Sequence, residues 1–261
     1  MLERIRLEVS GGIARLVLTQ ADRGNPIDGG FCEEFGEVAV RLSADPSVRA
    51  VLLSAEGKAF SYGGDISTFV EDLDELPRNI RRWTQTLHSA VARLQRIDAP
   101  IVALVHGVCA GGMVGVVAGA DMVIAADRAK FVAAYAGIGF CPDAGTSIML
   151  NRRLGNARAR RFLLLGETLD AQAALAAGLV DEVHRLDAAA PRAEAIAAQL
   201  AAGPTKAFGE MRRLMTSVLD QPLEAQLELE AQALARCAAT ADARGALAAF
   251  AEGRQPTFQG E

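Results

Sequence analysis

Residues 101–117 read Ile-Val-Ala-Leu-Val-His-Gly-Val-Cys-Ala-Gly-Gly-Met-Val-Gly-Val-Val, an aliphatic run followed by small residues and a second apolar run. Its first part, Ile101–Val105, has the aliphatic composition of a buried strand. Small residues follow over Gly107–Gly112 and an apolar segment continues through Val117, so the stretch predicts a strand, a tight turn and a helix. Glycine at such a turn lets the backbone approach a ligand closely and leaves N–H groups pointing outward.

A second stretch has the same design. Residues 59–66 read Ala-Phe-Ser-Tyr-Gly-Gly-Asp-Ile and follow another aliphatic strand, Ala50–Leu53. A helix that begins after such a turn adds a partial positive charge to its free amides. Two such turns that converge on one point would form an oxyanion hole. The alternative is that each Gly-Gly pair is only a turn. Neither stretch has the phosphate-binding Gly-x-x-x-x-Gly-Lys-Ser/Thr pattern or the dinucleotide-binding Gly-x-Gly-x-x-Gly pattern.

Strands and helices alternate in the first half of the chain, and from Ala144 onward the pattern is almost wholly helical. Asp28 is placed to cap a helix that ends at Asp45-Pro46, and a second helix is expected over Arg78–Gln95. The predicted strands are Ile5–Val9, Ile13–Leu18, Ala50–Leu53, Ile101–Val105, Met122–Ala125, Phe131–Ala134 and Leu179–Val183, the first two forming a hairpin. This order predicts an α/β fold with a C-terminal helical subdomain.

The helical tail has apolar residues on more than one face. Over Leu223–Phe250 these include Leu227, Leu234 and Leu247. Apolar surface that a short tail cannot bury by itself usually packs on another subunit. The alternative is that the tail folds back on its own core.

Composition indicates a soluble globular protein, since 51% of the 261 residues are hydrophobic and 23% are charged. The net charge of −5 and the lack of a basic patch argue against nucleic acid as a partner. No apolar run approaches the roughly 18 residues of a membrane span, and the N-terminus lacks a signal core. Four cysteines and three histidines are scattered without metal-ligand spacing. We therefore expect no metal site, no disulfide framework and a cytoplasmic location.

Along nearly its whole length the chain resembles the crotonase (enoyl-CoA hydratase/isomerase) superfamily. The two glycine turns are similar to the two oxyanion turns of that family, and further segments follow in the family's order and spacing. The segments that carry the resemblance are Ala59–Ile66, Gly107–Gly112, Gly119–Ala126, Ala129–Phe131, Ile138–Gly145 and Phe250–Phe258.

The resemblance implies a spiral of β-β-α units over residues 1–200 and a helical trimerisation subdomain over residues 201–261. It implies homotrimers and often hexamers, and the N–H groups of Gly64 and Gly112 as the oxyanion donors. The substrate would be an acyl-CoA thioester, as in fatty acid metabolism. Coenzyme A would be part of that substrate, so no separate cofactor is expected.

The family's hydratases hold two glutamates that activate a water, at positions that match Gly115 and Tyr135. Neither residue is an acid here, which argues against a hydratase. The remaining carboxylate is Asp143, and some family isomerases acting on enoyl-CoA or ring-epoxide CoA esters carry a similar Pro-Asp. A single base suffices to move a proton between carbons beside a polarised thioester. The sequence therefore favours an isomerase with Asp143 as the base, although Asp143 is also placed to be a helix N-cap.

Besides a true hydratase, two other interpretations stay open. The family's 4-chlorobenzoyl-CoA dehalogenases place a histidine, a tryptophan and a nucleophilic aspartate at positions similar to His88, Tyr135 and Asp143, so aryl-CoA chemistry by nucleophilic attack is the first. Tyr135 in place of tryptophan departs from that pattern. The second is a CoA-ester binder that has lost its chemistry, which the missing glutamates motivate.

Contacts to coenzyme A are expected mainly from the first glycine turn and from the C-terminus. By the resemblance, the C-terminal residues would reach the ligand of a neighbouring subunit. Surface or structural roles are the alternatives for the charged residues. The candidates are Arg23, Lys58, Ser61, Asp65, Ile66, Phe250 and Arg254.

Overall fold

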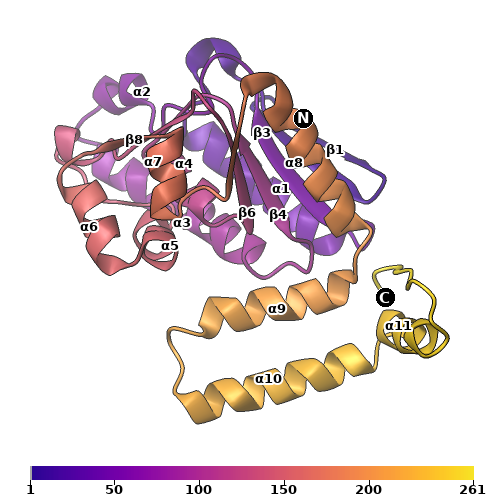
Figure 1. The fold of residues 1–261 in the computed structure, drawn as a ribbon. Coiled ribbons are helices and arrows are strands. Elements are labelled where there is room, and N and C mark those ends of the chain that lie inside the picture. The colour runs from indigo at the N-terminus through magenta and orange to yellow at the C-terminus, as the bar shows by residue number, and fades with distance from the viewer. Residues whose placement is uncertain (1) are drawn as a thin grey trace.

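The chain opens with the predicted hairpin, in which β1 (Ile5–Ser10) and β2 (Ile13–Leu18) pair antiparallel. The computed structural model describes residues 2–261 (Figure 1). Four more strands continue the sheet from β2, all parallel to their neighbours, in the order β1-β2-β3-β4-β6-β9. These strands are β3 (Ala50–Ala55), β4 (Ile101–Val105), β6 (Met122–Ala126) and β9 (Glu182–His184).

A second, three-stranded sheet explains the spiral. It has the order β5-β7-β8, with β5 (Val108–Ala110), β7 (Lys130–Val132) and β8 (Thr168–Asp170). Strands β4 and β5 are consecutive in the chain but lie in different sheets, and β6 and β7 repeat this step. Each strand pair therefore turns a corner from the large sheet to the small one before the next helix. This is the predicted α/β arrangement of β-β-α units.

Two strand predictions need correction and two strands were missed: β5, which lies within the Gly107–Gly112 stretch expected to be a turn, and β8. The apolar residues Leu179 and Val180 are not in a strand, because both amides donate to the carbonyl of Ala174 and complete the end of a helix. The strand expected over Phe131–Ala134 ends at Val132, where the chain turns. Strand β8 has only three residues, too few to show a period in the sequence.

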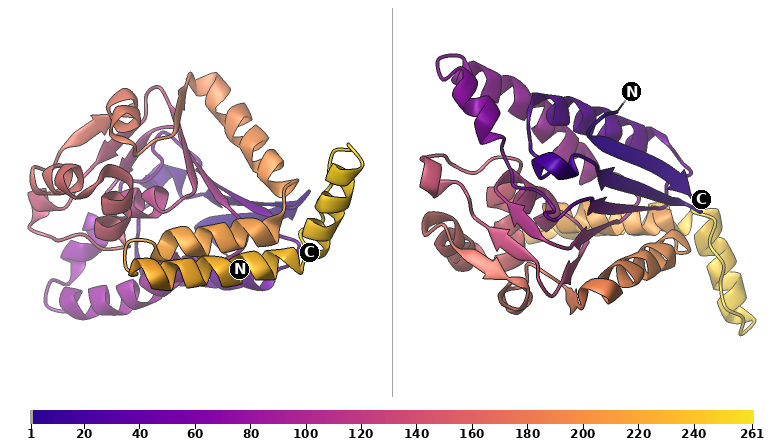
Figure 2. Two further views of the ribbon diagram at one scale, coloured as in Figure 1. Left: turned by 60° about the horizontal axis from the view of Figure 1, so that its bottom comes forward. Right: turned by 90° about the horizontal axis from the view of Figure 1, so that it is seen from above.

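Helices cover both faces of the large sheet. On one face, α1 (Gly29–Ala44) packs against α3 (Leu76–Leu94) above the main core, and Asp28 caps α1 by accepting from the amide of Phe31, as expected. On the other face lies α8 (Leu186–Ala201), as Figure 2 shows. The remaining helices of this part are α2 (Ile66–Glu71), α4 (Gly112–Ala118), α5 (Thr146–Leu154), α6 (Asn156–Leu164) and α7 (Ala171–Ala177), with short 3₁₀ turns at Ala21–Arg23 and Ala136–Ile138.

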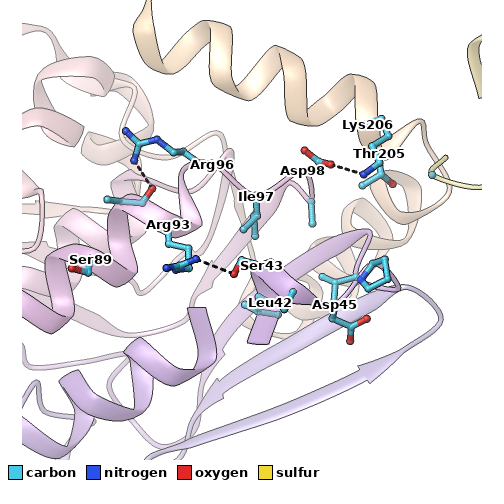
Figure 3. Close-up of a pocket in the computed structure, with 16 residues that line it drawn as sticks. Leu42, Ser43, Asp45, Ser89, Arg93, Arg96, Ile97, Asp98, Thr205 and Lys206 are labelled. Atoms are coloured by element: carbon cyan, nitrogen blue, oxygen red, sulfur yellow. Dashed lines mark hydrogen bonds and ion pairs between the residues drawn. The ribbon is translucent and has the colours of Figure 1, made fainter. Parts of the chain in front are cut away.

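The last three helices extend beside this core. Helices α9 (Thr205–Ser217) and α10 (Leu223–Ala238) run antiparallel below it, and α11 (Ala241–Ala251) leads away at one end (Figure 1). A polar cavity of about 680 Å³ separates the ends of α1 and α3 from the start of α9. Figure 3 shows that Lys206 of α9 pairs with Asp98 across this cavity.

One buried arginine ties the C-terminal helices to the core. Arg212 of α9 is only 8% exposed. Its Nε contacts both carboxylate oxygens of Asp121, and Nη1 and Nη2 donate to the carbonyls of Ile97 and Leu94. Asp121 in turn accepts from the amide of Ile101, the first residue of β4. The guanidinium thus joins α9 to the connection between α3 and β4.

Replacing Arg212 by methionine should therefore lower the free energy of unfolding by about 3–5 kcal/mol, because one carboxylate and two carbonyls lose their partner. Urea denaturation measures this change. The control is Arg160→Met on the exposed face of α6, which should change the free energy by less than about 0.5 kcal/mol. Equal effects of the two substitutions would contradict the role given to Arg212.

Candidate active site

The two glycine turns lie against each other. The amides of Phe60 and Ser61 both donate to the carbonyl of Val108, at 2.9 and 3.0 Å, and the amide of Ala110 donates to the carbonyl of Ser61 at 2.9 Å. Gly63 has φ +81°, and a Cβ there would lie 2.8 Å from the carbonyl oxygen of Ala110. A side chain at position 63 would therefore push the turns apart.

The amides of Gly64 and Gly112 are both available to a ligand. Ile27 bonds to the residues on either side of Gly64, donating to the carbonyl of Gly63 and accepting from the amide of Asp65. As in any parallel pairing, the N–H of the middle residue then points to the opposite side. Gly112 is the first residue of α4, where helical amides lack intrahelical partners. Within residues 2–261, neither amide donates to a protein acceptor.

Both glycines line one cavity of about 500 Å³. Its walls come from the chain before α1, from α2 and α3, and from the loop that precedes α5. Helix α3 contributes four side chains to this wall. These α3 residues recur at helical spacing, and this pattern could have identified them from the sequence. They are Ile80, Trp83, Thr84 and Leu87.

Asp143 and Tyr135 form a pair in the wall of this cavity. The Tyr135 hydroxyl donates to Asp143 Oδ1 at 2.8 Å and lies 3.0 Å from Thr146 Oγ1. Burial, and then the charge of the Asp143 carboxylate, raise the pKa of Tyr135, so the phenol keeps its proton and acts as the donor. The Oδ1 atom lies 2.9 Å from the point where a Cβ on Gly112 would stand. The carboxylate is therefore beside one of the two free amides.

The N-cap interpretation of Asp143 is wrong. Helix α5 begins at Thr146 and its N-cap residue is Gly145, which has no side chain to cap it. Asp143 contributes only its backbone carbonyl, which accepts from the amide of Thr146 at 2.8 Å. Its side chain is therefore left to the cavity and to Tyr135.

His88 contacts the backbone of the segment that carries Asp143. Its Nε2 accepts the amide of Ala144 at 3.0 Å. Ala144 is fully buried and has φ +50°, a left-handed conformation that costs a residue with a Cβ about 1–2 kcal/mol. His88 lines a separate cavity of about 320 Å³ on the outer side of this segment, which Asp143 also borders. It does not line the cavity that holds Gly64 and Gly112.

The residues predicted to contact coenzyme A lie in different environments. Arg23 joins the caps of two helices, since it pairs with Asp28 of α1 and with Asp65, which caps α2. Burial tends to raise the pKa of Asp65, but hydrogen bonds from Ser67 and Thr68 outweigh it and the pKa is lowered. Asp65 is thus an ionised structural cap.

The other candidates divide between the interior and the surface. Ser61 is fully buried, and its hydroxyl donates to the carbonyl of Asn25 and accepts from the amide of Gly63 within the turn. Ile66 lines the cavity, and Lys58 is exposed at the start of the turn.

Phe250 and Arg254 lie far from the cavity of their own chain. Phe250 is 84% exposed on α11, and Arg254, just after this helix, pairs with Glu252. Figures 1 and 2 show α11 at the opposite end of the molecule from α2. Contact of these two residues with a ligand of a neighbouring subunit stays a prediction.

The comparisons with known proteins agree with this geometry. Residues 8–261 match the family model described as enoyl-CoA hydratase/isomerase. The 1,2-epoxyphenylacetyl-CoA isomerase of Escherichia coli (strain K12) is 31% identical, with 100% of each chain covered. The 4-chlorobenzoyl coenzyme A dehalogenase-1 of an Arthrobacter species is 32% identical over 87% of this chain and 83% of its own. A crystal structure from Mycobacterium abscessus, described as an enoyl-CoA hydratase/isomerase, superposes with a TM-score of 0.91 at 35% identity, covering 98% of this chain and 100% of that one.

The fold and the paired free amides define an acyl-CoA enzyme with the crotonase fold. The chain belongs to the enoyl-CoA hydratase/isomerase family. Over residues 2–261, no helix is both long and apolar enough to span a membrane. In the same range, His, Cys, Asp and Glu side chains form no group of three or more that could hold a metal ion.

The hydrogen bond from Ala144 to His88 predicts different outcomes for two substitutions. His88→Gln keeps an acceptor at a similar place, so stability and turnover of an enoyl-CoA ester should stay within about threefold of wild type. His88→Leu leaves a buried amide unpaired and should lower the free energy of unfolding by about 1–3 kcal/mol. Urea denaturation and steady-state kinetics on both variants check this. A glutamine variant that is stable but inactive would instead indicate that the imidazole takes part in the chemistry.

Proposed function

We propose that the protein isomerises an enoyl-CoA-type thioester by moving a proton through Asp143. The observation that carries this proposal is the place of the carboxylate: Oδ1 lies 2.9 Å from where a Cβ on Gly112 would be, at the same end of the cavity as the free amides. A thioester held by Gly64 and Gly112 would therefore have its α-carbon region beside the only carboxylate that lines this cavity in residues 2–261.

The chemistry follows from the charges. Two N–H donors on the thioester oxygen stabilise the negative charge that develops when a proton leaves a carbon conjugated with it, and one such donor is worth about 3 kcal/mol of barrier. Tyr135 donates to Oδ1 of Asp143, so Oδ2 is the oxygen left to accept the proton. The same group then returns the proton to a different carbon. The reaction has no net oxidation or group transfer, so we propose that it needs no cofactor beyond the coenzyme A of the substrate.

A hydratase is the less favoured reaction. By resemblance, its two glutamates would stand at positions 115 and 135. A Cβ on Gly115 would lie 2.3 Å from Thr146 Oγ1 and 2.7 Å from Thr146 Cα, so Thr146 occupies the space that a glutamate would need. At position 135 a phenol with a raised pKa replaces the second acid. Asp143 alone would have to position and activate the water.

The dehalogenase-like reaction is also less favoured, although one relative of this kind is 32% identical. Its histidine would have to activate a water near the aspartate ester. Here Nε2 of His88 is occupied by the amide of Ala144, and the ring lies outside the cavity with the free amides. A binder without chemistry is the remaining alternative, and the pairing of Tyr135 with Asp143 beside Gly112 speaks against it.

Assembly into trimers or hexamers is part of this proposal. The side chains of Leu234 and Leu247 on α10 and α11 are 72% and 68% exposed, and Phe250 is more exposed still. Removing apolar surface from water lowers the free energy, which favours burial of these residues against another copy of the chain. Such an arrangement would let Phe250 and Arg254 approach the coenzyme A of a neighbour.

Asp143→Asn should lower the rate of exchange of acyl protons with deuterated solvent by about 10²–10⁴-fold, because an amide of the same shape is not a base. Binding of the thioester should change by only a few-fold. NMR or mass spectrometry of the recovered ester measures the exchange. Asp127→Asn on the surface is the matched control and should behave as wild type. Full exchange in the Asp143 variant would remove the proposed base, and tight binding without exchange in the wild type would support the binder.

Leu234→Glu should convert the assembly to smaller species, because it would bury a charge in the proposed interface. Sedimentation velocity measures the mass. Leu164→Glu on α6 has a similar exposure, 69%, and lies outside the helical subdomain, so we expect it to leave the trimer intact. A wild-type protein that sediments as a monomer would contradict this part of the proposal.

A further inference from the structure

The cavity that contains Gly64 and Gly112 has an unusual concentration of aromatic side chains. Its wall contains the chain's only tryptophan, both of its tyrosines and two of its ten phenylalanines. Aromatic residues make up only 5% of the sequence, so this wall is far richer in them than the chain as a whole. These wall residues are Tyr62, Phe69, Trp83, Tyr135 and Phe140.

Three of these rings form a nearly parallel array. Phe69 lies 5.9 Å from Phe140 with an angle of 25° between the planes, and 6.2 Å from Trp83 with an angle of 19°. The three residues come from α2, α3 and the loop before α5, so tertiary packing aligns them. Offset parallel rings at these separations are a favourable arrangement, which another planar ring can extend.

The array begins at the oxyanion site. A Cβ on Gly64 would lie 2.8 Å from Cζ of Phe69, so this ring is in contact with the backbone that supplies a free amide. Trp83 packs so closely on the first residue of α1 that a Cβ on Gly29 would overlap its indole. The indole is therefore held in place. The rings therefore continue the cavity wall from the backbone of Gly64, where the carbonyl of a bound thioester would lie.

Part of the ring surface is uncovered in this chain. Phe140 is 38% exposed and Tyr62 is 57% exposed at the edge of the cavity. Cys32, deeper in the wall, has its pKa raised to about 12 by burial and then by nearby carboxylates, so its thiol stays neutral and adds an uncharged surface. The ring faces and the neutral thiol favour an apolar group over a charged one as the group that covers them.

We infer that the acyl group of the substrate carries an aromatic ring, which stacks on the array formed by Phe69, Trp83 and Phe140. This inference rests on the proposed function for the place of the thioester, and it adds the substrate class. A planar ring offers a face to the array and has no internal rotations to lose, whereas a long alkyl chain must be ordered bond by bond.

Two pairs of esters separate ring recognition from chemistry. The saturated esters 5-phenylpentanoyl-CoA and undecanoyl-CoA have the same number of acyl carbons and test binding alone. Simple hydrophobic transfer favours the linear chain, which has more CH₂ groups to bury, so a preference for the ring reports the shape of the pocket. The unsaturated pair, 5-phenylpent-3-enoyl-CoA and undec-3-enoyl-CoA, tests proton exchange. Calorimetry measures the dissociation constants, and quenching of the single tryptophan gives a second measure where Trp83 is kept.

The phenyl ester should bind at least about fivefold more tightly than the linear one. Trp83→Leu and Phe140→Leu should each bring this ratio towards one. Phe140 is partly exposed, so its variant keeps the test valid even if the Trp83 variant does not fold. Phe208→Leu, on α9 and away from the cavity, is the matched control and should keep the wild-type ratio.

The two proposals fail in different ways. Equal or tighter binding of undecanoyl-CoA, or a ratio that the Phe140 and Trp83 variants leave unchanged, would overturn the aromatic substrate class even if isomerisation occurs. A preference for the ring that depends on these residues, without proton exchange from the unsaturated esters, would support the inference and overturn the proposed isomerase.

Discussion

The structure depends on one contact, in which two glycine turns that are distant in the chain lie backbone against backbone. Three hydrogen bonds join Phe60 and Ser61 to β5, and the absence of a side chain at Gly63 allows this approach. The contact extends the small sheet into the first turn and leaves the amides of Gly64 and Gly112 facing one cavity. The bridge to Ile27 holds Gly64 and the first turn of α4 holds Gly112, so both amides are oriented in advance, as the proposed stabilisation of an oxyanion requires.

The second constraint acts on the segment that carries the carboxylate. Ala144 is held in a left-handed conformation, and three hydrogen bonds fix this segment. Tyr135 donates to the Asp143 carboxylate, the amide of Thr146 donates to the carbonyl of Asp143, and the amide of Ala144 donates to His88. Strained backbone persists where the surroundings over-determine it, and such places are often functional. The same packing brings Thr146 into the space beside Gly115, so the features that orient Asp143 also occupy the place of a second acid.

Much of the fold could be predicted from the sequence, because its signals are local. Alternation identified the opening hairpin, aliphatic runs identified the central strands, and the cap at Asp28 identified the start of α1. The errors occurred where a neighbour decides the outcome. Leu179 and Val180 are apolar enough for a strand, but their amides complete the end of a helix. The three-residue strand β8 is defined by its antiparallel pairing with β7, which no local pattern reveals.

The candidate site divides in the same way. The glycine pairs and Asp143 were visible as residue types in a recognisable order, because close backbone approach and proton transfer each require particular residues. Their environments were not visible: Asp65 caps a helix with Arg23 as its partner, His88 supports a backbone amide, and the rings beyond Gly64 form an array. Local pattern and residue type were enough to place the strand-turn-helix units and the chemical groups that they carry. Which groups meet, and which already have a neighbour as partner, depends on contacts between elements that lie far apart in the chain, so it became visible only in the folded molecule.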